Sequence, residues 1–165
     1  MANSGLGGPN EPGPDDRFDD LVTTNLNGTY RSIRAFESHL APGPEARHVV
    51  VIASILARIG VPGYTGYCAS KAGLLGLVRS FAAELAPANV QVNAICPGWV
   101  DTDLGGPRCD GGHPGRGACG GDEGGPFAPD ERARRRRRHG RLVLSLDAHG
   151  VTGQAIDQNN GAFML

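Results

Sequence analysis

The sequence predicts an α/β fold in which helices cover a doubly wound parallel sheet. The short β-branched run 48–53 has no polar alternation, which is typical of a strand that is covered on both faces. A second short strand is predicted over 90–95, and a helical pattern at 67–85 separates the two. Strand–helix–strand repeats of this size indicate a doubly wound sheet, whose ligands bind beyond the carboxyl ends of the strands.

The N-terminal part predicts a loop followed by one long helix. Glycines and prolines punctuate residues 1–14, so we expect no regular element there. A helix is predicted from Asp15 or Asp16 to about Leu40, before the Pro42-Gly43-Pro44 break, with Asn25 on or beside its buried face. Apolar residues recur along it at steps of three or four, as on one buried helical face; they are Phe18, Leu21, Val22, Leu26, Tyr30, Ile33, Phe36 and Leu40.

The middle of the chain places polar residues at strand ends. Ser54 follows the first strand, and the Pro97-Gly98 turn follows the second. Since parallel strands end at one edge of a sheet, we expect Ser54 and this turn at the same edge. The helix between them is predicted to begin at Tyr67 and to stop before Pro87. A last strand is predicted over 151–157.

The 165 residues suggest one domain, but the segment 105–141 has a different composition. It contains no Leu, Ile, Val or Met, and Phe127 is its only large apolar side chain. Such a segment cannot bury enough surface to offset its ordering entropy, so we expect it to be disordered. Our hypothesis for its origin is a pair of compensating frameshifts. The chain thus divides into 1–104, this insert before the last strand, and 142–165.

Charge and hydropathy favour a cytoplasmic protein without a membrane or nucleic-acid partner. The 16 basic and 17 acidic residues nearly balance. The longest apolar stretch, 49–57, is too short to span a bilayer, and the N-terminus lacks the apolar core of a signal peptide. Four cysteines without a CxxC pair make a disulfide framework unexpected.

Two further patterns near the C-terminal end allow alternatives that we rate as remote. The arginine run 134–138 could contact nucleic acid, but aromatic residues are not interleaved with it. Cys109, His113 and Cys119 could hold zinc, but their spacing matches no common site and a fourth ligand is not evident. We therefore predict no metal site.

Tyr67 and Lys71 form the pair that could carry chemistry. Four residues apart on a helix, they share one face. A lysine ammonium at that place would lower the pKa of the tyrosine and make it usable as a general acid or base. Ser54 could reach the same point and hydrogen-bond a carbonyl oxygen. Taken alone, such a pair is more often an ordinary contact on a helix surface.

The residues around this pair resemble four motifs of the short-chain dehydrogenase/reductase family. Tyr67-Cys68-Ala69-Ser70-Lys71 is similar to YxASK, with Ser54 at the family's distance of thirteen residues. Segment 25–28 (NLNG) is similar to NLxG, and segment 93–102 (NAICPGWVDT) is similar to NxxxPGxxxT. The four motifs stand in the family's order and at its intervals, which makes coincidence very improbable for 15–104.

This resemblance implies a Rossmann-like fold, an NAD or NADP cofactor and a catalytic set of four residues. Tyr67 would donate a proton to a substrate carbonyl, Lys71 would hold the nicotinamide ribose, and Ser54 would orient the carbonyl. Asn25 would fix a water that links Lys71 to solvent. The resemblance also implies that the cofactor contacts Pro97, Gly98, Val100 and Thr102. Family members pair two helices per subunit, so a homodimer or homotetramer is expected; small residues that fit this pairing are Gly73, Gly76, Ala82 and Ala83.

The ends of the chain extend the resemblance and also limit it. Ala2-Asn3-Ser4-Gly5 resembles the family's NNAG turn, which would make Asn3 and Gly5 cofactor contacts. The glycine-rich TGxxxGxG turn that cradles the cofactor pyrophosphate in this family has no counterpart here. We therefore expect that the N-terminal cofactor-binding half, roughly three strands with their helices, is missing.

Two functions follow as alternatives. The first is an NAD(P)(H)-dependent oxidoreductase that reduces a ketone or oxidises a secondary alcohol, with a small-molecule substrate. The motif arrangement is shared with 3-oxoacyl-(acyl-carrier-protein) reductases, so a 3-oxoacyl thioester is one expected substrate. The alternative is a catalytically inert fragment that acts at most as an oligomerisation partner.

Overall fold

The computed structural model describes residues 1–41, 43–98 and 148–159. Two predicted cofactor contacts, Val100 and Thr102, lie outside the described residues. The predicted insert 105–141 also lies outside them.

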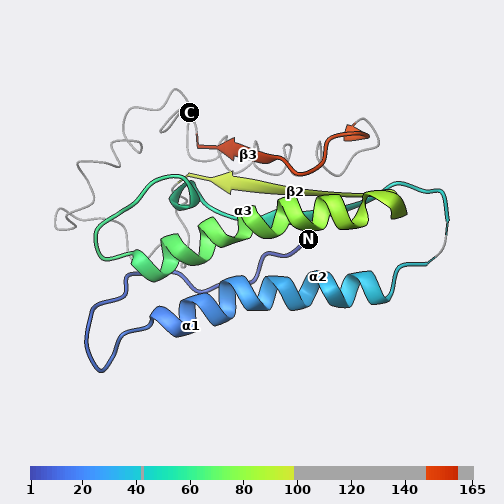
Figure 1. Ribbon diagram of the computed structural model, residues 1–165. Helices are drawn as coiled ribbons and strands as arrows, with labels where there is room; N and C mark the ends of the chain where they lie inside the picture. Colours follow the sequence, from blue (N-terminus) through green and yellow to red (C-terminus); the bar gives the residue numbers. More distant parts are fainter. Residues whose placement is uncertain (42, 99–147, 160–165) are drawn as a thin grey trace, which may run out of the picture.

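The described residues form a parallel sheet with helices packed on one of its faces (Figure 1). Strands β1 (Arg47–Ile52), β2 (Val90–Pro97) and β3 (Ala155–Gln158) lie side by side in that order. All six residues of β1 have a register partner in β2, from Arg47 opposite Val90 to Ile52 opposite Ile95. The prediction of a parallel α/β sheet is confirmed, and the three strands end at one edge.

The N-terminal segment continues the sheet on the free side of β1. Ala2 forms a parallel bridge with Val51: its amide donates to the Val50 carbonyl, and its carbonyl accepts from the Ile52 amide, at 2.9 and 3.0 Å. The rest of residues 1–14 is irregular, as its glycines and prolines predict. The turn at 2–5 therefore lies beside the end of β1.

The predicted first helix contains a π-helical turn. It consists of α1 (Phe18–Val22), the turn η1 (Thr23–Asn27) and α2 (Gly28–Ser38). Asp16 binds the first backbone amide of α1: its Oδ1 accepts from the Phe18 amide at 2.9 Å. The helix therefore begins two residues after Asp16 and ends two residues before the predicted Leu40.

The predicted buried face of this helix is wrong for three of its eight residues. Leu21 and Ile33 are almost fully buried. The side chains of Phe18, Tyr30 and Phe36, by contrast, are 36–43% exposed. An ideal α-helix turns by 100° per residue, and a π-turn fits more residues into one turn, so the apolar face shifts across η1 for Tyr30 and Phe36, which follow it; Phe18 precedes the turn and is exposed at the start of the helix.

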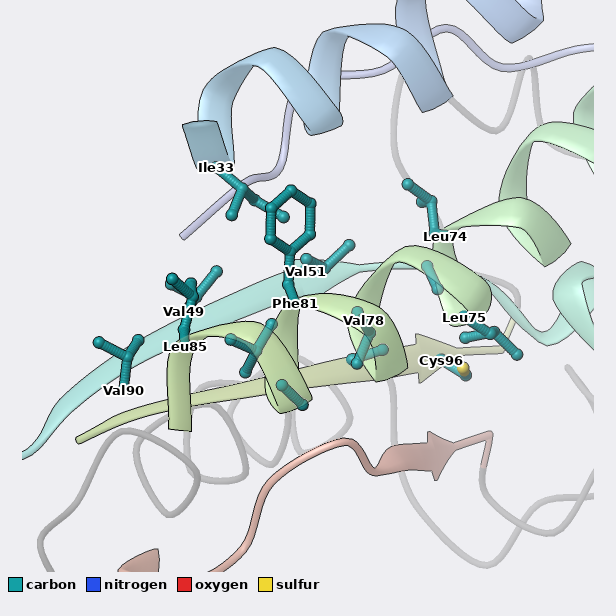
Figure 2. Packing of buried hydrophobic residues seen from close by; sticks show 14 residues of the cluster. Ile33, Val49, Val51, Leu74, Leu75, Val78, Phe81, Leu85, Val90 and Cys96 are labelled. Atoms are coloured by element: carbon teal, nitrogen blue, oxygen red, sulfur yellow. The ribbon is translucent and has the colours of Figure 1, made fainter. Parts of the chain in front are cut away.

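The core lies between the sheet and α3 (Thr65–Leu85), which is followed by the 3₁₀ turn η3 (Ala86–Ala88) containing Pro87. Figure 2 shows Leu74, Val78 and Phe81 of α3 packed towards Val49 and Val51 of β1. Each is at most 7% exposed. This burial fixes α3 along the sheet and therefore fixes the place of its first two turns.

The last strand is shorter than predicted and begins at Ala155 rather than at Val151. Gly153 has a φ of 72°, which bends the chain ahead of the strand. The buried side chain of Asn93 also donates to the Val151 carbonyl and accepts from the Gln154 amide, at 2.7 and 3.0 Å. Hydrogen bonds to an asparagine thus replace strand pairing over part of this segment.

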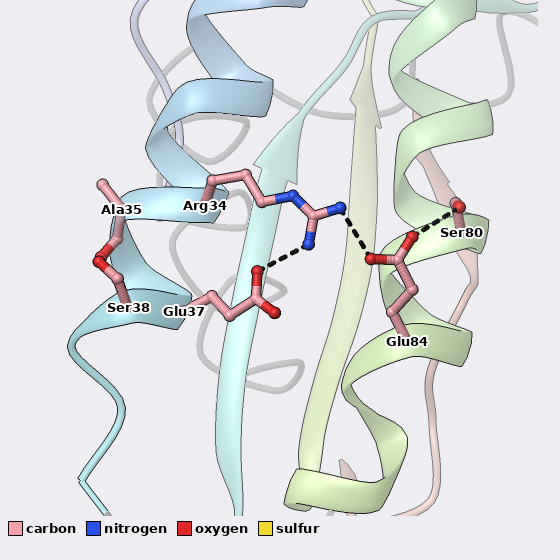
Figure 3. A network of polar contacts seen from close by, with 6 residues as sticks. All are labelled: Arg34, Ala35, Glu37, Ser38, Ser80 and Glu84. Carbon is pink, nitrogen blue, oxygen red and sulfur yellow. Dashed lines mark hydrogen bonds and ion pairs between the residues drawn. The ribbon is translucent and has the colours of Figure 1, made fainter.

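A polar network joins α2 to α3 at the end remote from Tyr67. In Figure 3, Arg34 reaches between Glu37 of its own helix and Glu84 of α3, with N–O distances of 2.7 and 2.9 Å. Its guanidinium also lies 4.6 Å from the centre of the Phe81 ring. These groups are more than a third exposed, so the contact contributes little to stability compared with the core.

Two of the four small residues expected at a subunit interface are used within the chain. Gly73 lies against Leu26, because a Cβ there would come within 3.0 Å of that side chain. Ala82 is buried, whereas Gly76 and Ala83 are exposed. Among the described residues, no helix has the length and apolar character needed to cross a bilayer.

Candidate active site

The predicted catalytic residues gather around the carboxyl edge of the sheet. Ser54 follows β1 after one residue, and Tyr67 and Lys71 lie in the first two turns of α3. The bridge at Ala2 brings Gly5 to the same region, where its Cα faces Asn25 and Lys71. Four separate segments thus contribute to one site.

Lys71 is buried and points at the end of β1. Its side chain is 7% exposed, and its Nζ donates to the Ile52 carbonyl at 3.0 Å. The same Nζ lies 5.6 Å from the centre of the Tyr67 ring. The single lysine of the chain is therefore placed by a strand carbonyl and lies next to the tyrosine that precedes it by one turn.

Burial is the main influence on both ionisable groups. It lowers the pKa of Lys71 from 10.5 to about 8 and raises the pKa of Tyr67 above its ordinary 10.0. A hydrogen bond from Ser54 offsets only part of the rise at Tyr67. The expectation that the pKa of Tyr67 is lowered below its ordinary value is therefore wrong for this structure, because burial raises it. At neutral pH the phenol is protonated and the ammonium is largely charged.

The lowered pKa of Lys71 predicts an unusual pH dependence of stability. Between pH 8 and 10 the unfolded chain keeps a proton on Lys71 that the folded chain has released, so the free energy of unfolding rises with pH. Below pH 8 both states are protonated and this contribution is constant. We expect wild type to gain at most about 1.4 kcal/mol per pH unit relative to Lys71→Met in urea unfolding. Parallel pH profiles for the two proteins would contradict this.

Ser54 is held in place by the backbone that follows it. It is 8% exposed, and its Oγ accepts from the Leu56 amide at 3.1 Å, at the start of the 3₁₀ turn η2 (Ile55–Ala57). Arg58 then ties this loop to β3 through the Ala155 carbonyl at 3.0 Å and Asp157 at 3.4 Å. The serine hydroxyl also lies close enough to Tyr67 to lower the pKa of that phenol, though less than burial raises it.

Asn25 lies in the π-turn and is 1% exposed. Its amide pairs with both backbone groups of Leu6: Oδ1 accepts from the amide at 2.7 Å, and Nδ2 donates to the carbonyl at 3.0 Å. Nδ2 also donates to Ser70 Oγ at 3.1 Å. In this structure Asn25 holds the N-terminal segment against α3; the predicted water relay to Lys71 stays a prediction. A π-turn at such a residue is a common feature of functional sites.

Gly5 and Asn3 lie in different surroundings. A Cβ at Gly5 would stand 2.9 Å from Asn25 Oδ1 and 3.7 Å from Lys71 Nζ, so only glycine leaves this approach open. Asn3 is exposed and lines a cavity of about 430 Å³ between the N-terminal segment, α2 and β1. None of Ser54, Tyr67 and Lys71 lines that cavity. It is therefore separate from the catalytic cluster.

Pro97 and Gly98 end β2 at the same edge as Ser54. The Gly98 amide donates to the Gln158 carbonyl at 3.0 Å, and a Cβ there would come within 3.0 Å of the Asn159 backbone. Glycine is thus needed where β2 and β3 come together. The Ala53 amide donates to the Ile95 carbonyl, which holds the Ser54 segment beside this turn.

Sequence reasoning missed the groups that hold the catalytic side chains. In the sequence Ser70 is only a member of the YxASK-like motif. In the structure its Oγ accepts from Asn25 Nδ2 and donates to the Tyr67 carbonyl, with 2.8 Å between Oγ and the carbonyl oxygen. Asn10, in a loop without any pattern, is buried at 6% exposure. The partner of Lys71 is a backbone carbonyl, which no side-chain pattern can reveal. Among the described residues, no group of three metal-ligating side chains lies together, and Cys68 and Cys96 are free thiols.

Comparison with known proteins agrees with this geometry. A family profile described as Enoyl-(Acyl carrier protein) reductase matches residues 1–162. The 3-oxoacyl-(acyl-carrier-protein) reductase of Pseudomonas aeruginosa is 39% identical over 90 residues, and the protein of the same description from Mycobacterium bovis is 33% identical. These matches include 54% of this chain and 36% of each relative. The chain thus spans little more than a third of the curated relatives it matches.

A solved structure extends the likeness to the whole described fold. The carveol dehydrogenase of Mycobacterium avium, solved in complex with NAD, superposes with a TM-score of 0.78 at 26% identity. The superposition covers 98% of this chain and 63% of that one. The resemblance to a short-chain dehydrogenase fold is therefore not limited to the four motifs.

Proposed function

Because the chain belongs to the short-chain dehydrogenase/reductase family, we propose that it acts in NAD(P)(H)-dependent interconversion of a ketone and a secondary alcohol. The observation that carries the proposal is the gathering of Ser54, Tyr67 and Lys71 at the carboxyl edge of a parallel sheet. Ligands of such sheets bind at this edge. The three side chains supply a hydrogen-bond donor, a proton donor and a cation.

The proposed reaction is balanced by one hydride and one proton. A bound reduced nicotinamide would supply the hydride for the carbonyl carbon, and the Tyr67 hydroxyl would supply the proton to the carbonyl oxygen. Ser54 donates a hydrogen bond to that oxygen, which orients the carbonyl and stabilises the developing negative charge. The charge of Lys71 then stabilises the phenolate left on Tyr67 until water returns a proton. Oxidation of an alcohol uses the same groups in reverse.

The protonation states of the free site favour the reductive direction near neutral pH. A general acid must carry its proton when the substrate arrives. The raised pKa of Tyr67 keeps the phenol protonated, and Lys71, with a pKa of about 8, remains largely charged. We therefore propose carbonyl reduction as the activity at pH 7. Alcohol oxidation would need the phenolate and would be favoured at alkaline pH.

The residues around Lys71 fit the nicotinamide end of the cofactor. Gly5 leaves open the approach to Asn25 and Lys71 that a Cβ would fill, and Pro97 and Gly98 end the adjacent strand. We propose that these residues, with Tyr67 and Lys71, hold the ribose and nicotinamide. Asn3, Val100 and Thr102 remain proposed contacts on the resemblance alone. The choice between NAD and NADP stays open.

We also propose a 3-oxoacyl thioester as the substrate and a homo-oligomer as the assembly. The substrate class rests on the relatives, which are 3-oxoacyl-(acyl-carrier-protein) reductases over the matched part. The exposed small residues Gly76 and Ala83 on α3 support close contact with another helix.

Cofactor binding by the purified chain tests the proposal. We expect the fluorescence of the reduced nicotinamide to change and then level off as NADPH or NADH is titrated. We expect the absorbance of the reduced nicotinamide to fall when acetoacetyl-CoA is added. The two cofactors are compared because no acidic or basic selector has been identified. If neither binds up to millimolar concentration, the chain is an inert fragment of its family and the proposal is wrong.

A further inference from the structure

Asn10 connects the N-terminal loop to the first turn of α3. It is 6% exposed and hydrogen-bonds through both ends of its side-chain amide. Its Oδ1 accepts from the Gly66 amide at 2.8 Å, and its Nδ2 donates to Asp16 Oδ1 at 3.0 Å. The Thr65 hydroxyl lies within 3.2 Å of both Oδ1 and Nδ2 of Asn10. The backbone amide of Asn10 donates to the Gly63 carbonyl at 2.8 Å. A buried polar side chain with this many partners has one defined position.

These contacts replace a cap that α3 itself lacks. The residue at its N-cap position, Tyr64, makes no side-chain hydrogen bond to the helix start. An N-cap side chain normally accepts from the second or third amide of a helix, and Gly66 is the second residue of α3. Asn10 makes this bond from a distance of 56 residues in the sequence. The end of α3 next to Tyr67 therefore depends on the loop.

The loop is itself anchored on both sides of Asn10. Asn25 pairs with both backbone groups of Leu6, and Asp16 binds both Asn10 and the first amide of α1. Gly66 leaves no free space for adjustment: a Cβ there would lie 3.1 Å from Leu21, 3.1 Å from Phe18 and 3.2 Å from Asn10. The start of α3 is thus clamped between α1 and the loop.

We propose that Asn10 is a positioning residue that sets where Tyr67 stands relative to Ser54 and Lys71. Its significance for catalysis rests on the proposed function, in which Tyr67 donates the proton. Gly66 directly precedes Tyr67, so the hydrogen bond to its amide fixes the backbone from which the phenol extends. On the other side of Tyr67, its carbonyl is held by Ser70, which Asn25 holds in turn. The loop residues Leu6 and Asn10 therefore fix the tyrosine from both directions.

A measurement on the unaltered chain gives the first test. Amides in the first turn of a helix have no partner within the helix and exchange rapidly unless something else binds them. We expect the Gly66 amide to exchange at least about tenfold more slowly than the intrinsic rate of an unprotected glycine amide. Exchange at the intrinsic rate would overturn the proposal, because Asn10 would then not hold α3 in solution.

The second test follows the ionisation of residue 67 in folded variants. With 3-fluorotyrosine at position 67, the phenol is more acidic and its fluorine resonance reports the titration. We expect Asn10→Ala to lower the titration midpoint of residue 67 by roughly half to one pH unit. In the wild type burial raises the pKa of this phenol, and in the variant water reaches it. The double variant Asn10→Asp/Asp16→Asn keeps an oxygen for the Gly66 amide and exchanges the two groups of the Asn10–Asp16 contact at unchanged net charge, so its midpoint should not fall below that of wild type. Asn27→Ala, at an exposed asparagine, is the matched control.

Every outcome of this comparison decides the question. Equal midpoints for wild type and a folded Asn10→Ala, or the same fall in Asn10→Ala and in the double variant, would show that Asn10 does not position Tyr67. If Asn10→Ala fails to fold, exchange at Gly66 and the midpoint of the double variant decide. Neither readout needs cofactor or substrate. A chain that binds no cofactor would thus contradict the proposed function and leave the role of Asn10 to be judged separately.

Discussion

Tyr67→Phe is expected to lower the rate of carbonyl reduction by about 10²–10⁴-fold, the usual contribution of a positioned general acid. The substitution removes only the hydroxyl and keeps the ring in its partly buried place beside Lys71. The proton donor of the proposed reaction is then absent, while the other groups proposed to hold cofactor (Gly5, Lys71, Pro97 and Gly98) are unchanged. The turnover number should therefore fall much further than cofactor affinity.

The matched control for this substitution is Tyr30→Phe. Tyr30 lies on α2, is 43% exposed, and would keep the contact of its ring with Phe81, at 5.9 Å between centroids. We expect Tyr30→Phe to keep wild-type turnover, and both variants to keep the fluorescence response to bound cofactor. If Tyr67→Phe kept turnover within a few-fold of wild type, another group would have to supply the proton.

The sequence predicted the architecture well because its signals are local. The β-branched run at 48–53 and the apolar period of 67–85 each reflect burial of one element, and each produced an element within two residues of its predicted bounds. The grouping of the candidate catalytic residues was predictable for a related reason. Ser54 and the turn at Pro97 follow strands, and parallel strands bring such positions to one edge whatever the remaining details.

The failures depend on helix irregularity and on contacts between distant segments, neither of which a simple period encodes. The exposure of Tyr30 and Phe36 follows from a π-turn, which no simple period includes. The pKa of Tyr67 is raised mainly by burial, which a spacing of four residues does not reveal. Asn10 carries no local signal, because its partners lie up to 56 residues away.

Stability also depends on contacts between distant segments, and the core between α3 and the sheet is where this dependence can be tested most directly. Phe81 is 2% exposed, is packed in the cluster of Figure 2, and lies beneath the Arg34 guanidinium at 4.6 Å. Its replacement by alanine removes most of a buried aromatic side chain and leaves a cavity that the sheet side, with Val49 and Val51, can fill only in part. We expect Phe81→Ala to lower the free energy of unfolding by about 3–5 kcal/mol in urea titrations.

Phe36→Ala on α2 is the control for this loss, because Phe36 is 36% exposed and lies outside the buried core cluster. Its cost should be well below that of Phe81→Ala, and equal costs would mean that the packing in Figure 2 does not determine stability. Since a loss of about 3–5 kcal/mol is a large part of the stability of a small domain, Phe81→Leu serves as a milder variant with a smaller loss in the same direction. The experiment also bears on function. Tyr67 and Lys71 lie in the first turns of the helix that Phe81 anchors near its other end, so a folded Phe81→Leu should loosen the helix from that end and affect the catalytic pair last.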